Sequence, residues 1–186
     1  MRNVVLYHLQ ALDGVSLDDD SDWFTDAGPE MFANLGRIIG SQDDVLLGRV
    51  SYDNWADFWS NSDLEPFASF INGSPKHVFT STALDRPWAN ATAVSTSPAE
   101  YVADLKRQPG GDIGIHGSIR LASSLLRAGL VDVIELAVAP AVAGQGRRVF
   151  DGDDTKQSLQ LTDVSHSPAG TLFLTYRRAS APDSET

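Results

Sequence analysis

Residues 110–150 read GGDIGIHGSIRLASSLLRAGLVDVIELAVAPAVAGQGRRVF and predict a strand, a tight turn, a helix and a second strand. The first strand is short and is expected at 112–115. The second, at 131–139, is rich in β-branched residues, as a buried strand of a parallel sheet would be. Gly129 stands between helix and strand, where a helix commonly ends in a left-handed residue. The apolar residues of the helix share one face because they recur at intervals of three and four: Leu121, Ala122, Leu125 and Leu126.

The turn at His116-Gly117 leads into the start of that helix. Ser118 is a candidate cap, since its hydroxyl can accept a bond from a first-turn N–H group. Free N–H groups and the helix dipole favour an anion at such a place. However, the glycine spacing matches neither the dinucleotide fingerprint nor the P-loop. Two interpretations therefore stay open: phosphate binding, or a glycine that only lets helix and strand pack closely.

A similar unit precedes this stretch. A helix is expected at 29–39, and a short buried strand at 45–47 runs into Gly48-Arg49-Val50-Ser51. Ser51 is a candidate cap of the helix that follows. The apolar stripe of that helix is expected to belong to the core rather than to a ligand site: Tyr52, Trp55, Phe58 and Trp59.

The rest of the chain continues the alternation of strands and helices. The expected elements are a strand at 4–9, a helix at 64–71, strands at 76–80 and 91–94, a helix at 98–108, and a closing antiparallel pair at 159–164 and 171–177. This order predicts an α/β fold of three layers, α/β/α, around a mostly parallel sheet with an antiparallel C-terminal strand. We expect one domain over 1–179 and a polar tail at 180–186.

Three loops fall at the carboxyl ends of the predicted parallel strands, which is where such sheets bind ligands. They are 48–51, Ser81-Thr82 and 116–120. Two helix starts, an arginine and paired hydroxyls at one edge suit a nucleotide with several phosphates. We therefore expect these loops to lie side by side.

Composition narrows the class of protein. The formal net charge of −11 argues against non-specific nucleic-acid binding, and the absence of cysteine excludes thiolate catalysis and Cys-ligated zinc. The four histidines show no metal spacing. No apolar run approaches the roughly 20 residues of a membrane span, and no signal peptide is evident, so a cytoplasmic protein is expected. Acidic runs such as 18–20 and 151–154 are interpreted as solvated loops.

The chain resembles the dihydrofolate-reductase-like superfamily, in particular the bacterial branch related to the C-terminal reductase domain of the riboflavin-biosynthesis deaminase–reductase. The matching segments appear in family order and cover most of the chain: 12–14, 46–49 with 51–52, 75–79 with 81–82, 111–113 with 116–118 and Leu121, 125–126 with 129–132, Pro140, 144–146 and Phe150. The resemblance implies the same fold, NADPH as cofactor, a small heterocyclic substrate and a possible homodimer.

The resemblance also implies roles for individual residues. Arg49 and Ser51 would contact the cofactor phosphates, Ser81 and Thr82 would lie near the adenosine 2′-phosphate, and the 117–120 loop would lie under the pyrophosphate. The segment 11–14 would lie beside the nicotinamide. The implied cofactor-binding residues are Ala11, Gly48, Arg49, Ser51, Ser81, Thr82, His116, Gly117, Ser118, Ile119 and Arg120.

Two departures from the family bear on the reaction. The phosphate loop has His116-Gly117 where a Gly-Gly pair is common. The first helix presents Met31, Phe32 and Leu35 where dihydrofolate reductases carry a carboxylate. The candidate catalytic residues are therefore Asp13, although an Asp beside Gly is more often only a turn former, and Glu30, the nearest carboxylate. The sequence predicts an NADPH-dependent reductase of a pterin-like or ribosylamino-pyrimidine-like ring, or alternatively a non-catalytic protein that binds a nucleotide or pterin on the same fold.

Overall fold

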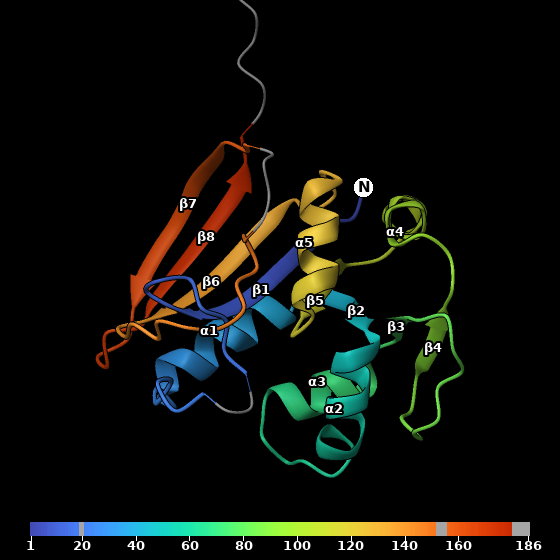
Figure 1. Ribbon diagram of the computed structural model, residues 1–186, viewed down its shortest axis with the longest axis horizontal. Helices are drawn as coiled ribbons and strands as arrows, with labels where there is room; N and C mark the ends of the chain where they lie inside the picture. Colours follow the sequence, from blue (N-terminus) through green and yellow to red (C-terminus); the bar gives the residue numbers. More distant parts are fainter. Residues whose placement is uncertain (19–20, 152–155, 180–186) are drawn as a thin grey trace, which may run out of the picture.

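The computed structural model describes residues 1–18, 21–151 and 156–179, so the predicted tail at 180–186 lies outside the described residues. Its centre is one eight-stranded sheet with the order β4-β3-β2-β5-β1-β6-β8-β7 (Figure 1). The strands are β1 Val4–Ala11, β2 Gln42–Gly48, β3 Lys76–Phe79, β4 Ala91–Val94, β5 Asp112–His116, β6 Val133–Ala139, β7 Leu159–His166 and β8 Leu172–Arg178. The helices are α1 Pro29–Ile39, α2 Arg49–Trp59, α3 Phe67–Gly73, α4 Pro98–Arg107 and α5 Ile119–Arg127.

Strands β1 to β6 pair in parallel, and β8 joins antiparallel both to β6 and to the edge strand β7. The predicted mostly parallel sheet with an antiparallel C-terminal end is therefore confirmed. The 110–150 stretch folds as expected into β5, α5 and β6, and Gly129 adopts a positive φ of 67°.

Helices cover both faces of the sheet, which confirms the three layers. Alternation along the strands sends neighbouring side chains to opposite faces. Leu6 and Leu46 pack in the core beneath α4 and α5, whereas Val5 and Leu47 pack on the opposite face with α1, α2 and α3. The second face is therefore divided between α1 and the pair α2–α3.

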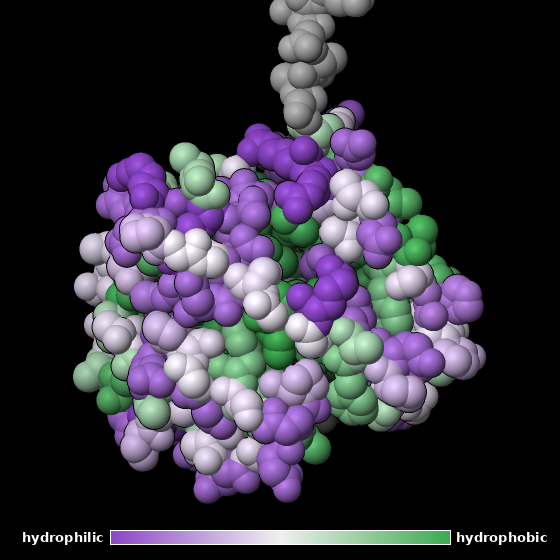
Figure 2. Space-filling view, turned by 180° about the vertical axis from the view of Figure 1, so that it is seen from behind, coloured by the Kyte–Doolittle hydropathy of each residue, from purple (hydrophilic) through white to green (hydrophobic). Residues whose placement is uncertain are grey.

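The predicted helix at 64–71 begins three residues late, at Phe67. Pro66 disfavours the helical conformation at Glu65, which explains why the helix does not extend back to Leu64; Pro66 is its N-cap residue. None of the helices in the described part of the chain is long and apolar enough to cross a membrane. Seen from the side opposite to Figure 1, most of the surface is polar, with small groups of apolar residues between polar ones (Figure 2).

Candidate functional site

The turns after β2 and β5 lie against each other, as expected, and are joined by a chain of hydrogen bonds. The backbone N–H of Gly48 donates to Ser118 Oγ at 2.9 Å, and the Ser118 hydroxyl donates to Ser51 Oγ at 2.8 Å. The Ser51 hydroxyl in turn donates to the carbonyl of Gly117 at 2.8 Å. The loop after β3 joins them through Arg49, so the predicted proximity of the three loops is confirmed.

Of the two predicted helix caps, Ser51 is wrong, whereas Ser118 has the predicted position without the predicted hydrogen bond. Helix α2 begins at Arg49, before Ser51, and its N-cap is Gly48. Ser118 is the N-cap residue of α5, but its hydroxyl bonds across to the other turn and not to its own helix. Neither helix start has a side-chain cap among the described residues. Their first-turn N–H groups are therefore available to an anion.

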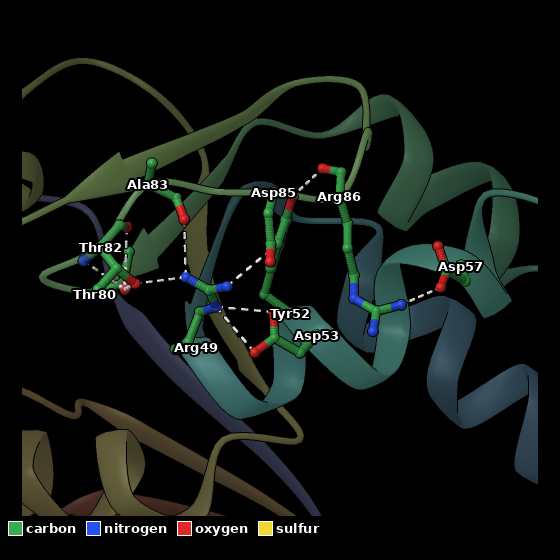
Figure 3. Close-up of polar contacts among 9 residues, drawn as sticks. All are labelled: Arg49, Tyr52, Asp53, Asp57, Thr80, Thr82, Ala83, Asp85 and Arg86. Carbon is green, nitrogen blue, oxygen red and sulfur yellow. Dashed lines mark hydrogen bonds and ion pairs between the residues drawn. The ribbon is translucent and has the colours of Figure 1, made fainter.

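Arg49 is held by protein groups on three sides (Figure 3). Its Nε donates to both carboxylate oxygens of Asp53, at 2.8 and 2.9 Å. One terminal nitrogen donates to Thr82 Oγ1 at 2.6 Å and to the Ala83 carbonyl at 2.9 Å, and the other donates to Asp85 at 2.8 Å. The expected phosphate ligands Arg49 and Thr82 thus bind each other, with two carboxylates beside them.

A cavity of about 260 Å³ opens beside these turns, at the carboxyl ends of β1 and β5. The two strands are neighbours, and the chain leaves them in opposite directions, from β1 towards β2 and from β5 towards β6. This is the topological switch point, where open α/β sheets bind their ligands. One wall comes from β1, the loop after it and α1: Tyr7, His8, Leu9, Leu17, Met31 and Leu35.

The other wall is largely aromatic. Trp55 meets Phe67 edge to face at a centroid distance of 5.9 Å, and Trp59 meets the same ring at 4.8 Å. The Trp55 ring also lies on the Gly117 backbone, so closely that a Cβ at Gly117 would come within 2.3 Å of it. The residues of this wall are Trp55, Trp59, Phe67, His116, Gly117 and Ile119.

The titratable groups of the cavity are uncharged at neutral pH. Burial lowers the pKa of His8 to about 4 and that of His116 to about 3. Burial, followed by the nearby charge of Glu135, raises the pKa of Tyr7. Glu135 itself neither lines the cavity nor meets solvent, because its buried carboxylate accepts bonds from Arg37 and Thr175.

The imidazoles are fixed by neighbouring side chains. His116 Nε2 lies 2.8 Å from Gln42 Oε1, and His8 Nε2 lies 3.1 Å from Ser16 Oγ. Because the amide oxygen can only accept, His116 donates from Nε2. His116 was expected in the cofactor loop. It is the last residue of β5 and forms part of the cavity wall.

The two candidate catalytic carboxylates lie elsewhere. Asp13 accepts bonds from the backbone N–H groups of Gly144, at 2.8 Å, and Ala143, at 3.3 Å. The bond from Gly144 is the main cause of its lowered pKa. Glu30 is exposed in the first turn of α1, while Met31 beside it faces the cavity.

The other expected cofactor residues surround the cavity mouth at different depths. Ala11 is buried at the end of β1, where its N–H donates to the Val15 carbonyl at 2.8 Å. Ile119 lines the cavity, whereas Arg120 and Ser81 are exposed. Whether these residues bind a cofactor stays a prediction.

Sequence reasoning missed the aromatic wall. Tyr52 is buried in the core as expected, and Trp55 and Trp59 pack against that core, but both also line the cavity, and Phe58 is exposed. Their spacing of four residues shows only that they share a face of α2. What that face meets depends on α3, which brings Phe67 to the same wall.

Comparison with known proteins agrees with this architecture. Residues 2–174 match the family model of the RibD C-terminal domain. The uncharacterized protein YyaP of Bacillus subtilis (strain 168) is 26% identical over 183 residues, which cover 94% of each chain. The Bacillus subtilis protein and the family model are each similar to this chain over nearly the whole length of the described fold.

Two solved structures share the fold at low identity. A putative riboflavin biosynthesis protein from Shewanella sp. PV-4 superposes with a TM-score of 0.76 at 18% identity, covering 96% of this chain and 99% of the other. A diaminohydroxyphosphoribosylaminopyrimidine deaminase/5-amino-6-(5-phosphoribosylamino)uracil reductase from Thermotoga maritima superposes with a TM-score of 0.68 at 18% identity, over 96% of this chain and 57% of the other.

Proposed function

Since the chain belongs to the RibD C-terminal domain family, we propose that it is an NADPH-dependent reductase that delivers hydride to a pterin-like or ribosylamino-pyrimidine-like ring. The observation that carries this proposal is the cavity at the β1–β5 switch point, with two helix starts beside it that lack side-chain caps in the described structure. A ring binds in such a cavity, and phosphates bind at such helix starts.

The residues at the turns fit a dinucleotide in chemistry. The first-turn N–H groups of α2 and α5 can donate to phosphate oxygens, and Arg120 adds an exposed positive charge at the start of α5. NADPH, when bound, supplies the hydride. The chain then has to position the two rings and exclude water, a task that suits the apolar wall of Trp55, Trp59 and Phe67.

The end of β1 forms a firm edge beside the cavity. Gly14 adopts a φ of 82°, and its N–H donates to the Ala11 carbonyl at 2.9 Å, which closes the turn. Asp13 then fixes the loop at 143–144 through two backbone bonds. We therefore assign Asp13 to positioning this edge, beside which the nicotinamide would bind.

A cofactor titration tests the proposal. Arg120→Ala removes the charge at the start of α5, and Arg127→Ala removes the matched exposed charge at its other end. A charge-assisted hydrogen bond contributes about 1.5–3 kcal/mol, so Arg120→Ala should weaken NADPH binding roughly tenfold or more. The Arg127→Ala affinity should equal that of the wild type. If NADPH fluorescence shows no saturable change with the wild-type protein, the proposal is wrong.

Turnover is tested separately by NADPH oxidation. The substrates to compare are dihydrofolate and the phosphoribosylamino-uracil named for the Thermotoga maritima relative. Oxidation that depends on one of these rings supports a reductase of that ring. Cofactor binding without oxidation of NADPH by any heterocycle in the screen supports the second candidate.

That second candidate is a protein that binds a nucleotide or pterin without turnover. The observation in its favour is that no carboxylate stands among the described residues that line the cavity. Such a protein would gain thermal stability from its ligand, by mass action, yet would leave NADPH unoxidised.

A further inference from the structure

The cavity wall carries no formal charge, which restricts what can enter it. The described lining residues include no Arg, Lys, Asp or Glu. Its three titratable side chains, Tyr7, His8 and His116, are buried to at least nine-tenths. The buried carboxylate behind Tyr7, that of Glu135, is already paired with Arg37 at 2.8 Å. A charged group in this cavity would therefore lose its water without gaining a counter-ion.

That loss is costly for a phosphate or a carboxylate. The effective penalty of burying an unpaired ion is several kcal/mol. Arg49 could have offset it, but four of its N–H groups are directed at Asp53, Thr82, Ala83 and Asp85. Arg49 is thus already paired with the protein's own carboxylates, and it is not among the described residues that line the cavity.

The wall favours a flat ring instead. Trp55, Trp59 and Phe67 form edge-to-face pairs, an arrangement that offers ring faces and edges to an incoming aromatic system. The cavity, at about 260 Å³, is also slightly smaller than the roughly 300–1,000 Å³ of pockets for drug-sized ligands. It therefore suits one small ring system.

A few neutral polar groups can orient such a ring. The Tyr7 hydroxyl has only a long contact of 4.0 Å with the Met31 sulfur among the described residues. His8 and His116 each use one ring nitrogen for a neighbour, and the other nitrogen of each ring has no hydrogen-bond partner among the described residues. An apolar cavity with a small number of neutral hydrogen-bonding groups is typical of sites for uncharged ligands.

We propose that the substrate of this site, given the proposed reductase function, is a small, planar, uncharged heterocycle that carries neither phosphate nor carboxylate. The phosphorylated pyrimidine of the riboflavin-type reaction is thereby disfavoured. A pterin or an unphosphorylated ribosylamino-pyrimidine fits the same cavity.

Matched pairs of ligands test this inference. The pairs are pterin with pterin-6-carboxylate, and 5-amino-6-ribosylamino-uracil with its 5′-phosphate. Melting temperature and calorimetric affinity are measured for each compound, with and without saturating NADPH. The uncharged member of each pair should bind at least roughly tenfold more tightly, since one ionic group left without a partner costs more than 1.4 kcal/mol.

A charge placed in the wall should reverse the preference. Leu35→Arg puts a cation on the α1 side of the cavity, and Leu35→Met is the neutral control of similar volume. Circular dichroism and the NADPH titration check that each variant is folded. Leu35→Arg should prefer the charged member of each pair, and Leu35→Met should keep the preference for the uncharged member.

Three results would overturn the inference: equal or tighter wild-type binding of a charged member, failure of every uncharged member to bind, or an unchanged preference in a folded Leu35→Arg protein. The failure of the proposed function is distinguished by a different readout. If NADPH does not bind while the uncharged rings do, the reductase is excluded and the ligand class remains. If NADPH binds and the charged rings win, the reductase remains and the ligand class is excluded.

Discussion

The guanidinium of Arg49 donates to the carboxylate of Asp85 at 2.8 Å, across 36 residues of sequence, in the loop expected to hold a phosphate (Figure 3). Asp85 is largely exposed, with 71% of its side chain accessible, whereas Asp53 lies on the same helix as Arg49. A phosphate approaching Arg49 would therefore displace Asp85 more readily than Asp53. Asp85 thus ties the loop after β3 to Arg49, and a phosphate would compete with Asp85 for that guanidinium.

Asp85→Asn should therefore raise the affinity for NADPH and leave that for NADH unchanged. Exposed ion pairs contribute about 0.2–1 kcal/mol, so the gain should be about 1.4- to fivefold. Fluorescence titration of both coenzymes measures it. Asp57→Asn is the matched control, because Asp57 pairs with the adjacent Arg86 and is similarly exposed, at 65%. Equal effects of Asp85→Asn on NADPH and NADH would show that the 2′-phosphate, the one group in which the two coenzymes differ, does not compete for Arg49.

Gly117→Ala should reduce both stability and ligand binding. Gly117 adopts a φ of 62°, and a Cβ there would lie 2.3 Å from Trp55. The left-handed backbone alone costs a non-glycine residue about 1–2 kcal/mol, and Trp55 must move as well. Gly144→Ala is the matched control, since Gly144 has a φ of 79° and nothing within 4 Å of its Cβ position.

Urea unfolding of these variants should separate the cost of the left-handed backbone from the cost of the clash with Trp55. Gly144→Ala should lose about 1–2 kcal/mol from backbone strain and keep ligand binding. Gly117→Ala should lose more and should also lose affinity for the ring. Equal losses of stability with unchanged binding in both variants would mean that the contact between Trp55 and Gly117 does not shape the cavity.

As the solution is acidified, the free energy of unfolding should begin to fall at a pH well above the pKa values of ordinary carboxylates. His8 and His116 have folded-state pKa values of about 4 and about 3, below the unfolded value of 6.5. The unfolded state binds more protons in this window, so stability is complete above pH 6.5 and falls as pH drops towards 4 and then 3. The two together should cost about 3 kcal/mol between pH 6.5 and 5. Urea unfolding against pH measures this slope.

His116→Gln should halve that slope while keeping a group that can donate to Gln42. His166→Gln is the control, because His166 is exposed on β7. Its slope should match that of the wild type. An unchanged slope in His116→Gln would show that His116 is protonated in the folded protein.

The sequence predicts those parts of the fold that follow from local pattern. The strand, helix and strand of 110–150 and the parallel sheet depend on apolar periodicity and on glycines such as Gly129, which the chain shows directly. The meeting of the turns after β2 and β5 also follows, because the carboxyl ends of parallel strands share an edge.

Side-chain partners across the fold were not predictable in the same way. Ser118 and Ser51 were expected to cap their own helices, yet they bond to each other because β2 and β5 are neighbours. Asp85 reaches Arg49 only because of the path of the loop after β3. The aromatic wall needed α2 and α3 to be packed together before Trp55, Trp59 and Phe67 could be seen as one surface.

Tyr7→Phe should lower turnover more than Asp13→Asn, although Asp13 was the candidate from sequence. Reduction of a ring by hydride also needs a proton, and Tyr7 is a cavity group that keeps its proton at neutral pH because burial raises its pKa. Asp13 has a lowered pKa, so it is ionised, and its oxygens are bonded to the backbone at 143–144. General acids contribute about 10²–10⁴-fold, and a phenol of raised pKa should lie at the lower end of that range. The kcat of Tyr7→Phe should therefore fall by about 10²-fold, with NADPH affinity unchanged.

Asp13→Asn should instead lower the melting temperature and leave the pH profile of kcat as it is. A loss of the acidic limb of that profile in Asp13→Asn, with full activity in Tyr7→Phe, would return the proton transfer to Asp13.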